Sequence, residues 1–235
     1  MPTAAMLVIG DEILSGRTQD VNVQVLAQAL GAKGIGLAEV RMVPDVEAEI
    51  VGAVDALRSK YDHVFTSGGI GPTHDDITAD CIAKAFGVGI DVREDARAIL
   101  ATNYADPEND LNEARLRMAR IPDGAALIDN PISKAPGFTL GNVHVMAGVP
   151  KIFAVMVESV VATLEGGAPL ISEEHRVESG EGDLAAPLAQ IVARHPEVSI
   201  GSYPRIVDGR FQVNVVARAV DRAKLDAAMA DIRTL

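Results

Sequence analysis

The sequence predicts an α/β fold with a mostly parallel sheet covered by helices on both faces, followed by a second, smaller α+β domain. Three apolar segments of strand length each precede a helical pattern of apolar residues, and such alternation is typical of right-handed βαβ crossovers. Towards the C-terminus, apolar and polar residues alternate with a period of two, which indicates a sheet with one buried and one solvated face. The glycine-rich stretch 165–169 separates the two patterns, so the predicted domains are residues 1–167 and 172–235.

The first two units each consist of a strand, a loop and a helix. Residues 4–9 and 36–43 are predicted strands, and apolar residues recur at helical spacing over 21–30 and 46–57. Because sheets of parallel strands bind their ligands beyond the carboxyl ends of the strands, the loops that follow these strands are the first candidates for a binding site.

The third unit contains the most distinctive stretch of the chain, residues 66–76 (TSGGIGPTHDD). Residues 62–66 are a predicted strand, and a helix is expected to begin at about Thr73. Three glycines let the backbone approach a ligand closely, and free N–H groups at a helix start favour phosphate. Thr73 and Asp76 also fit a capping box in which nothing is bound, and the local pattern leaves both interpretations open.

The rest of the chain contains a polar segment outside the sheet (residues 93–120, called the polar excursion below), a hairpin, a long helix and the small domain. Residues 93–120 are polar and helix-prone, with a break between two helices at 107–110. A hairpin is expected to join strands 137–140 and 143–146, and a helical stripe follows over 153–164. The elements predicted for the small domain are a strand at 175–179, a helix at 183–195, strands at 198–203 and 210–219, and a helix at 221–232.

Composition and charge exclude several classes of protein. The chain has 235 residues and a net charge of −12 without a Lys/Arg-rich run, so a nucleic-acid surface is not expected. Cys81, the single cysteine, lies on an apolar helical stripe and is expected to be a core residue rather than a nucleophile. The N-terminus lacks the basic region of a signal peptide, and no segment resembles a transmembrane helix. We therefore expect a soluble cytoplasmic protein without membrane partners.

Acidic residues follow all three strands of the predicted parallel sheet. Asp11 with Glu12, then Asp45, then Asp75 with Asp76 should gather at one edge. Carboxylates clustered beside a phosphate site repel one another and the phosphate unless a cation is present. Asp11, Asp45 and Asp76 are therefore the predicted ligands of a divalent metal such as Mg²⁺, Mn²⁺ or Co²⁺. Helix capping is the ordinary alternative for Asp45.

Other polar loops contain further candidate ligand contacts. The first loop, 10–22, is long for a strand-to-helix connection, although helix capping is the favoured role of Asp20 and Asn22. Lys134 lies in a proline-bounded loop, where it is either solvated or paired with a phosphate. A second glycine turn, at Gly148, directly precedes a helix and is another potential anion contact. The predicted ligand-binding residues are Gly10, Asp11, Ser67, Gly68, Gly69, Gly71, Thr73, Lys134 and Gly148.

Three motifs carry a resemblance to a known family: residues 10–22 (GDEILSGRTQDVN), 43–45 (VPD) and 68–78 (GGIGPTHDDIT). A weaker match continues through 135–138 and 200–204. On these residues the chain resembles the molybdopterin-binding superfamily, and within it the N-terminal region of competence/damage-inducible protein A and of eukaryotic FAD synthase. Ala147 departs from the family pattern, which commonly has proline at that position of the turn.

The resemblance implies a three-layer α/β fold that binds a pterin phosphate or an adenine nucleotide at the glycine loop, with Asp45 and Asp76 as catalytic residues. It favours a metal-dependent pyrophosphatase that acts on ADP-ribose or FAD-like dinucleotides. Two alternatives stay open: molybdopterin binding or adenylylation in molybdenum cofactor biosynthesis, and a non-catalytic nucleotide-binding module. We also expect a homo-oligomer, either a dimer or a trimer.

Overall fold

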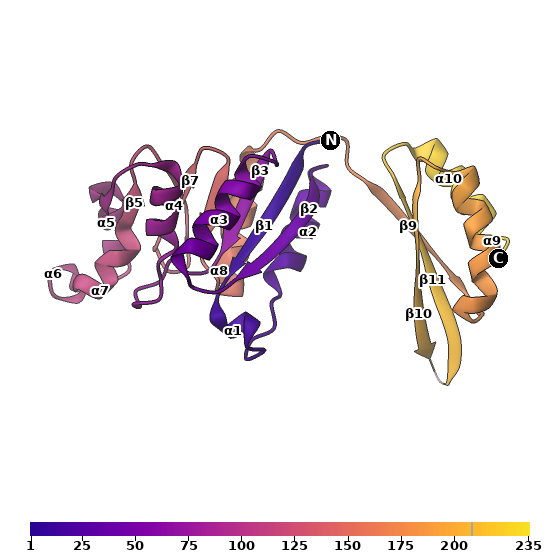
Figure 1. Ribbon diagram of the computed structural model, residues 1–235, viewed down its shortest axis with the longest axis horizontal. Helices are drawn as coiled ribbons and strands as arrows, with labels where there is room; N and C mark the ends of the chain where they lie inside the picture. The colour runs from indigo at the N-terminus through magenta and orange to yellow at the C-terminus, as the bar shows by residue number, and fades with distance from the viewer. Residues whose placement is uncertain (208) are drawn as a thin grey trace. The chain divides into compact units, whose positions relative to one another are not determined.

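The computed structural model describes residues 1–207 and 209–235. Within them the chain forms two compact units, Met1–Gly167 and Ala168–Leu235 (Figure 1). Each unit has a hydrophobic core of its own.

The first unit is built on a six-stranded sheet with the strand order β2-β1-β3-β8-β7-β6. Its strands are β1 (Thr3–Ile9), β2 (Gly36–Val43), β3 (His63–Ser67), β6 (Ala126–Ile128), β7 (Gly137–Leu140) and β8 (Val143–Met146). Strand β1 pairs in parallel with β2 and β3, and β3 pairs in parallel with β8. Strand β7 runs antiparallel to both of its neighbours, β6 and β8. The predicted mostly parallel sheet is confirmed, and so is the hairpin of β7 and β8, with the predicted bounds.

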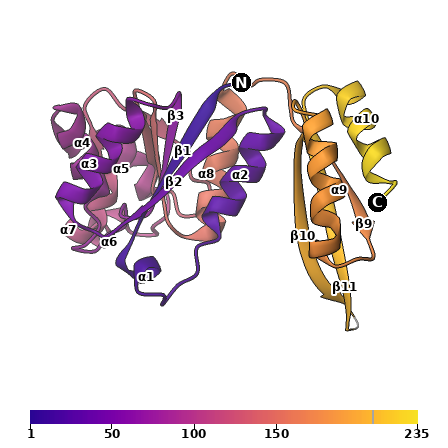
Figure 2. The same ribbon diagram turned by 45° about the vertical axis from the view of Figure 1, so that its right-hand side comes forward.

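Helices cover both faces of this sheet, so the unit has three layers (Figures 1 and 2). The helices packed on the sheet are α2 (Asn22–Ala32), α3 (Glu47–Arg58), α4 (Thr78–Phe86) and α8 (Pro150–Thr163), and the short α1 (Asp11–Leu14) follows β1. Alternate residues of β1 enter the two cores: Leu7 packs with α3 and α4, and Met6 packs with α2 and α8. Burial on both faces explains why β1 is a continuous apolar run rather than an alternating one.

Cys81 is on the core-facing side of α4, as its position on the apolar stripe predicts. The residue is 1% exposed, and burial raises the pKa of its thiol to about 11. A thiol that stays protonated at neutral pH is a poor nucleophile, so the core interpretation is confirmed.

The helix after the glycine loop begins later than the sequence suggested. Helix α4 starts at Thr78, not at about Thr73, and residues 71–75 form a turn ahead of it. The Asp76 carboxylate accepts hydrogen bonds from the Thr73 N–H (2.8 Å) and from the Thr73 hydroxyl (2.5 Å). Because these local bonds compete with helical ones, Thr73 and Asp76 close a separate turn instead of capping the helix.

The polar excursion also differs in detail from the prediction. It contains β4 (Ile90–Val92), α5 (Glu94–Ala101), α6 (Pro107–Asp110), α7 (Glu113–Leu116), the 3-10 turn η1 (Arg117–Ala119) and β5 (Arg120–Pro122). The predicted break at 107–110 is itself a helical turn, because Pro107 occupies its first position and Asp106 accepts a hydrogen bond from the Asn109 N–H. Strands β4 and β5 pair with each other outside the main sheet, and neither was predicted.

The second unit is a three-stranded antiparallel sheet with the order β10-β11-β9, covered by two helices (Figure 2). Its elements are β9 (Ile171–Val177), α9 (Glu181–Arg194), β10 (Ser199–Val207), β11 (Arg210–Ala219) and α10 (Arg222–Ile232). The small α+β domain is confirmed, and the period-two pattern places Val213, Val215 and Ala217 in its core. The prediction placed the first strand at 175–179, but β9 runs from 171 to 177 because it pairs with β11 as far as Ala219.

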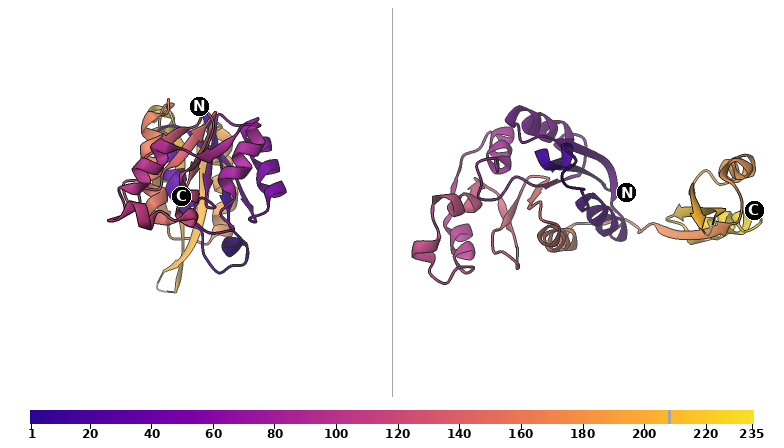
Figure 3. Two further views of the ribbon diagram at one scale, coloured as in Figure 1. Left: turned by 90° about the vertical axis from the view of Figure 1, so that its left-hand side faces the viewer. Right: turned by 90° about the horizontal axis from the view of Figure 1, so that it is seen from below.

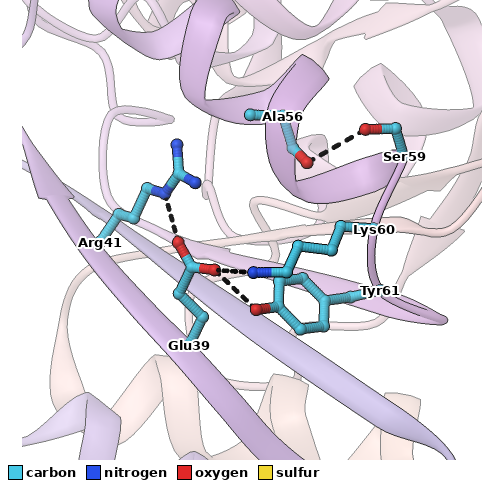
Figure 4. A network of polar contacts seen from close by, with 6 residues as sticks. All are labelled: Glu39, Arg41, Ala56, Ser59, Lys60 and Tyr61. Atoms are coloured by element: carbon cyan, nitrogen blue, oxygen red, sulfur yellow. Dashed lines mark hydrogen bonds and ion pairs between the residues drawn. The ribbon is translucent and has the colours of Figure 1, made fainter.

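A polar network ties the edge strand β2 to the turn between α3 and β3 (Figure 4). The Glu39 carboxylate accepts hydrogen bonds from the Tyr61 hydroxyl (2.6 Å), from Arg41 Nε (2.6 Å) and from Lys60 Nζ (3.0 Å). The Tyr61 hydrogen bond, followed by those of Arg41 and Lys60, lowers the pKa of Glu39 to about 2. The Glu39 carboxylate therefore stays charged at neutral and mildly acidic pH.

In the part of the chain that the structure describes, no helix combines the length and the apolar composition needed to cross a membrane.

Two histidines meet at the centre of the main sheet. His144 of β8 is 4% exposed, and its Nε2 lies 3.3 Å from Nδ1 of His63 on β3. Its other ring nitrogen, Nδ1, is 3.0 Å from the Thr139 hydroxyl. Burial, together with the neighbouring His63, lowers the pKa of His144 to about 4, and burial also lowers the pKa of His63. Because the pKa of both imidazoles is lowered, the contact joins two neutral rings near pH 7, with one nitrogen donating and the other accepting.

This pair predicts a loss of stability in mild acid. Between pH 6.5 and about 4 the unfolded chain binds a proton at residue 144 while the folded chain does not, so the free energy of unfolding falls as the pH falls. The expected contribution is on the order of 2–3 kcal/mol across that window. Urea denaturation from pH 7.5 to 4 should show a shallower loss for His144→Gln than for the wild type. His74→Gln, which changes a 98% exposed side chain, is the control and should leave the wild-type slope unchanged.

Candidate functional site

The loops after β1, β2, β3 and β8 meet at one edge of the main sheet and enclose a pocket of about 530 Å³. This edge points downwards in Figure 1, and the right-hand view of Figure 3 looks onto it. Gly10 and Glu12 come from the first loop, Asp45 from the second, 68–72 with Asp75 and Asp76 from the third, and 147–150 from the fourth. The convergence of strand-end loops that the sequence predicted therefore produces a cavity of ligand size.

The floor of the pocket is a backbone turn that only glycine fits. Gly68 has φ 108°, and a Cβ there would lie 2.2 Å from the Ile9 carbonyl oxygen. Gly69 has φ 68°, and a Cβ there would lie 2.1 Å from the Thr78 hydroxyl, which donates a hydrogen bond to the Gly68 carbonyl. Both positions combine a left-handed conformation with a close neighbour.

This turn presents hydrogen-bond donors to the cavity. Among the described residues, the N–H groups of Gly69, Gly71 and Gly148 have no acceptor within the protein, and all three residues line the pocket. Free amides in a concave backbone turn form an anion-binding site. The Gly69 and Gly71 donors lie in the turn after β3 rather than at a helix start, because α4 begins only at Thr78, whereas Gly148 lies in the turn after β8, just before α8.

Asp45 is held at the pocket wall by the first loop. Its Oδ2 accepts a hydrogen bond from the Asp11 N–H at 3.1 Å. Helix α3 has Val46 as its N-cap residue and no side-chain cap, so Asp45 does not have the capping role that was the ordinary alternative. Burial, and then repulsion from Asp11, Glu12 and Asp75, raises the pKa of Asp45 above its ordinary value, although the Asp11 N–H opposes the shift. A cation in the pocket would relieve this repulsion.

Asp76 is fixed from two sides. Its carboxylate closes the turn with Thr73 and lies so close to Gly71 that a Cβ on Gly71 would approach Oδ2 to 2.7 Å. Its backbone carbonyl accepts a hydrogen bond from the Arg117 guanidinium at 3.0 Å. Arg117 belongs to the polar excursion, so this segment helps to hold the turn that contains Asp76 in place. Neither periodicity nor motif spacing indicated this role of Arg117.

The structure brings most of the predicted site residues to the pocket. Gly10, Asp45, Gly68, Gly69, Gly71, Asp76 and Gly148 line it. Asp11, Ser67, Thr73 and Lys134 do not line it. Glu12 and Ser133 occupy the wall in place of their neighbours Asp11 and Lys134, since adjacent residues of a loop point in different directions.

The loop that contains Lys134 is organised by a buried asparagine. Asn130 is 1% exposed and donates to the Ser133 hydroxyl (2.7 Å) and the Ala135 carbonyl (2.8 Å). Lys134 has φ 59°, which is unusual for a residue with a side chain. The resulting turn places Ser133, not Lys134, against the cavity. The sequence marked this loop as polar but gave no means of choosing between the two residues.

The donor set suits a cation that is shared with a phosphate. Within residues 1–207 and 209–235, no group of three His, Cys, Asp or Glu side chains is arranged to hold a metal, so Asp11, Asp45 and Asp76 do not form a ready cage. The pocket wall nevertheless carries four carboxylates, those of Glu12, Asp45, Asp75 and Asp76. Proteins usually bind Mg²⁺ through one or two carboxylates together with substrate phosphates. Metal binding stays a prediction.

Comparison with known proteins assigns the family. Residues 5–166 match the profile described as "Probable molybdopterin binding domain", and residues 169–235 match the middle domain of FAD synthase. The chain belongs to the molybdopterin-binding domain family. The two matched regions correspond to the two compact units.

Members of the family with similar sequences come from all three domains of life. A Pyrobaculum calidifontis protein is 35% identical over 97% of this chain and 92% of its own length. The CinA-like protein of Myxococcus xanthus is 31% identical, and a protein of Caenorhabditis elegans named a probable FAD synthase is 30% identical. This chain spans 56% and 50% of those two proteins, respectively. The crystal structure of CinA from Thermoplasma acidophilum, a protein described as of unknown function, superposes with a TM-score of 0.63 and 34% identity, covering 68% of this chain and 95% of that one.

The glycine turn gives a stability prediction with a matched control. Gly69→Ala should lower the free energy of unfolding by at least about 2 kcal/mol, because the left-handed backbone strain is joined by a collision with Thr78. Gly87→Ala has nearly the same φ, 67°, but open space around its Cβ, and should cost only about 1 kcal/mol. Equal losses in chemical denaturation would show that the collision at Gly69 is absent.

Proposed function

We propose that this protein is a metal-dependent nucleotide pyrophosphatase acting on ADP-ribose or FAD-like dinucleotides. The observation that carries the proposal is the combination, in one pocket, of unpaired backbone N–H groups with a rim of carboxylates. Neutral amides hold a phosphate without a positively charged side chain, whereas carboxylates beside a phosphate need a cation between them. A diphosphate with a bound divalent metal matches this surface, because its phosphate oxygens can accept hydrogen bonds from the amides and its metal can bind the carboxylates.

In the proposed reaction, water attacks one phosphorus of the diphosphate and the bond from that phosphorus to the bridging oxygen breaks. ADP-ribose then yields AMP and ribose 5-phosphate. A divalent cation would be held by Asp45 and Asp76 and would supply Lewis-acid stabilisation of the phosphate oxygens. The N–H groups of Gly69 and Gly71 stabilise the negative charge that develops on the attacked phosphate.

The relatives support the same class of ligand. The middle domain of FAD synthase follows the molybdopterin-binding domain here, and one relative is named a probable FAD synthase, so a flavin dinucleotide or its adenylyl part is a reasonable ligand class. This chain covers only half of that relative, and the activity of the whole relative is not transferred with the name.

The first test is turnover with purified protein. Incubation with ADP-ribose or FAD and Mg²⁺, Mn²⁺ or Co²⁺ should release AMP, detected by anion-exchange chromatography, and EDTA should stop the release. Asp45→Asn and Asp76→Asn should each lower kcat about 100-fold or more, because each removes a charge that the transition state requires. Glu49→Gln, an exposed change on α3, is the control and should be near wild type. Absence of AMP with every metal and both substrates would refute the proposal.

A second test compares two neighbouring carboxylates. Glu12 lines the pocket and Asp11 does not, so Glu12→Gln should reduce kcat/KM at least tenfold more than Asp11→Asn. The comparison is matched because both variants remove one charge at adjacent exposed positions of the short helix α1. The opposite order would favour the metal ligand set predicted from the sequence, with Asp11 as a member.

A second function is favoured by the matched family description, which names molybdopterin as the ligand. In that case the pocket would bind a pterin phosphate and catalyse adenylyl transfer from ATP, or bind the pterin without reaction. Thermal-shift measurements with ADP-ribose, FAD, ATP and pterin phosphates, each with and without Mg²⁺, separate these possibilities, since stabilisation grows with ligand concentration relative to Kd. Stabilisation by a nucleotide without turnover would instead indicate a binding module.

A further inference from the structure

A small side cavity of about 60 Å³ adjoins the main pocket beneath the first loop. The two cavities share Ile9, Glu12, Thr18, Gly148 and Pro150 in their walls, so they are direct neighbours. The residues specific to the side cavity include Asp20, Asn22 and Ser67. Ser67 and Asn22 are 3% and 4% exposed, so this end of the cavity lies deep in the protein.

Asn22 connects the end of β3 to the glycine turn after β8. Its Nδ2 donates to the Ser67 hydroxyl and to the Gly148 carbonyl, both at 2.8 Å. A carbonyl oxygen can only accept, so the contact with Gly148 fixes which end of the amide carries the nitrogen. Asn22 therefore does not cap α2, contrary to the expectation from its position, while Asp20 does accept a hydrogen bond from the Val23 N–H at 2.9 Å.

The other end of the Asn22 amide has no partner. Its Oδ1 is buried and accepts no hydrogen bond from the residues that the structure describes. A buried acceptor without a donor is costly, and in a native protein it calls for an explanation such as a ligand or a bound water. Asn22 lines the side cavity, so this cavity is where a hydrogen-bond donor for the oxygen would have to lie.

The polar side chains around this cavity select the kind of group that fits. The Asn22 oxygen and the carboxylates of Glu12 and Asp20 are acceptors, and the two carboxylates repel phosphate. The Ser67 hydroxyl accepts from Asn22, so its own hydrogen remains available as a donor. A neutral group that both donates and accepts matches this set, and an alcohol hydroxyl of a sugar has that property.

We propose that the side cavity binds a ribose hydroxyl of the nucleotide whose phosphate lies on the glycine turn, with Asn22 as the residue that recognises it. This inference rests on the proposed nucleotide ligand of the main pocket. It adds a specificity element: the site distinguishes ribose from deoxyribose, because a deoxy sugar leaves the Asn22 oxygen unpaired.

The experiment uses the wild-type protein and three ligands: ADP, 2′-deoxy-ADP and 3′-deoxy-ADP, each with Mg²⁺, measured by isothermal titration calorimetry. At least one deoxy analogue should bind about tenfold more weakly than ADP. In Asn22→Ala the ratio between ADP and that analogue should fall to within twofold, which a purely structural role of Asn22 would not produce. Gln24→Ala, on an exposed position of α2, should keep the wild-type ratio.

The outcomes separate the two proposals. Equal affinity of ADP and both deoxy analogues for the wild type would overturn the hydroxyl site and leave nucleotide binding intact. Unchanged discrimination in a folded Asn22→Ala protein would overturn the role of Asn22. Failure of every nucleotide to bind would refute the nucleotide ligand and this inference with it. Should Asn22→Ala not fold, the wild-type series alone decides whether the hydroxyl is recognised.

Discussion

The parallel pairing of β1 with β2 and β3 is the constraint on which the rest of the structure depends. Strand β1 is buried on both faces and pairs in parallel with a strand on each side. Parallel strands cannot be joined by a tight hairpin, so the chain returns from the end of one strand to the start of the next through a helix that packs on a face of the sheet. As a result, the loops after these strands, together with the loop after β8, open on the same edge of the sheet. The pocket follows from this topology, and the side chains of the loops only determine its chemistry.

The pocket offers backbone N–H groups rather than basic side chains to a ligand. The protein has a net charge of −12, and carboxylates surround the mouth of the site. Amide N–H groups of Gly69, Gly71 and Gly148 supply the positive ends of dipoles without adding charge. A cation bound together with a phosphate would relieve the repulsion among the carboxylates; burial first, and then repulsion from Asp11, Glu12 and Asp75, raises the pKa of Asp45. The Arg117 guanidinium donates a hydrogen bond to the Asp76 carbonyl and so helps to position the turn after β3.

Hydrogen bonds between distant segments hold the site together. The Asn22 amide links the turns after β3 and β8, and the Asp45 carboxylate links the loops after β1 and β2. At the turn after β3, the Thr78 hydroxyl secures the Gly68 carbonyl. Because these contacts connect all four loops, the geometry of the pocket is set by tertiary hydrogen bonds in addition to the local conformation of the glycines.

The sequence alone determined the fold class, the two-part organisation, the order of strands and helices in the parallel region and the three motifs that mark the site. These features follow from apolar periodicity and from glycine spacing, which are properties of neighbouring residues. Only the tertiary structure decided that Glu12 rather than Asp11, and Ser133 rather than Lys134, face the pocket, because the direction of a loop side chain depends on contacts with other loops. The sequence also could not predict that α4 starts as late as Thr78 or that Asn22 bridges two segments. The reason is the same, because a side chain that fits a helix cap can instead form hydrogen bonds with other groups.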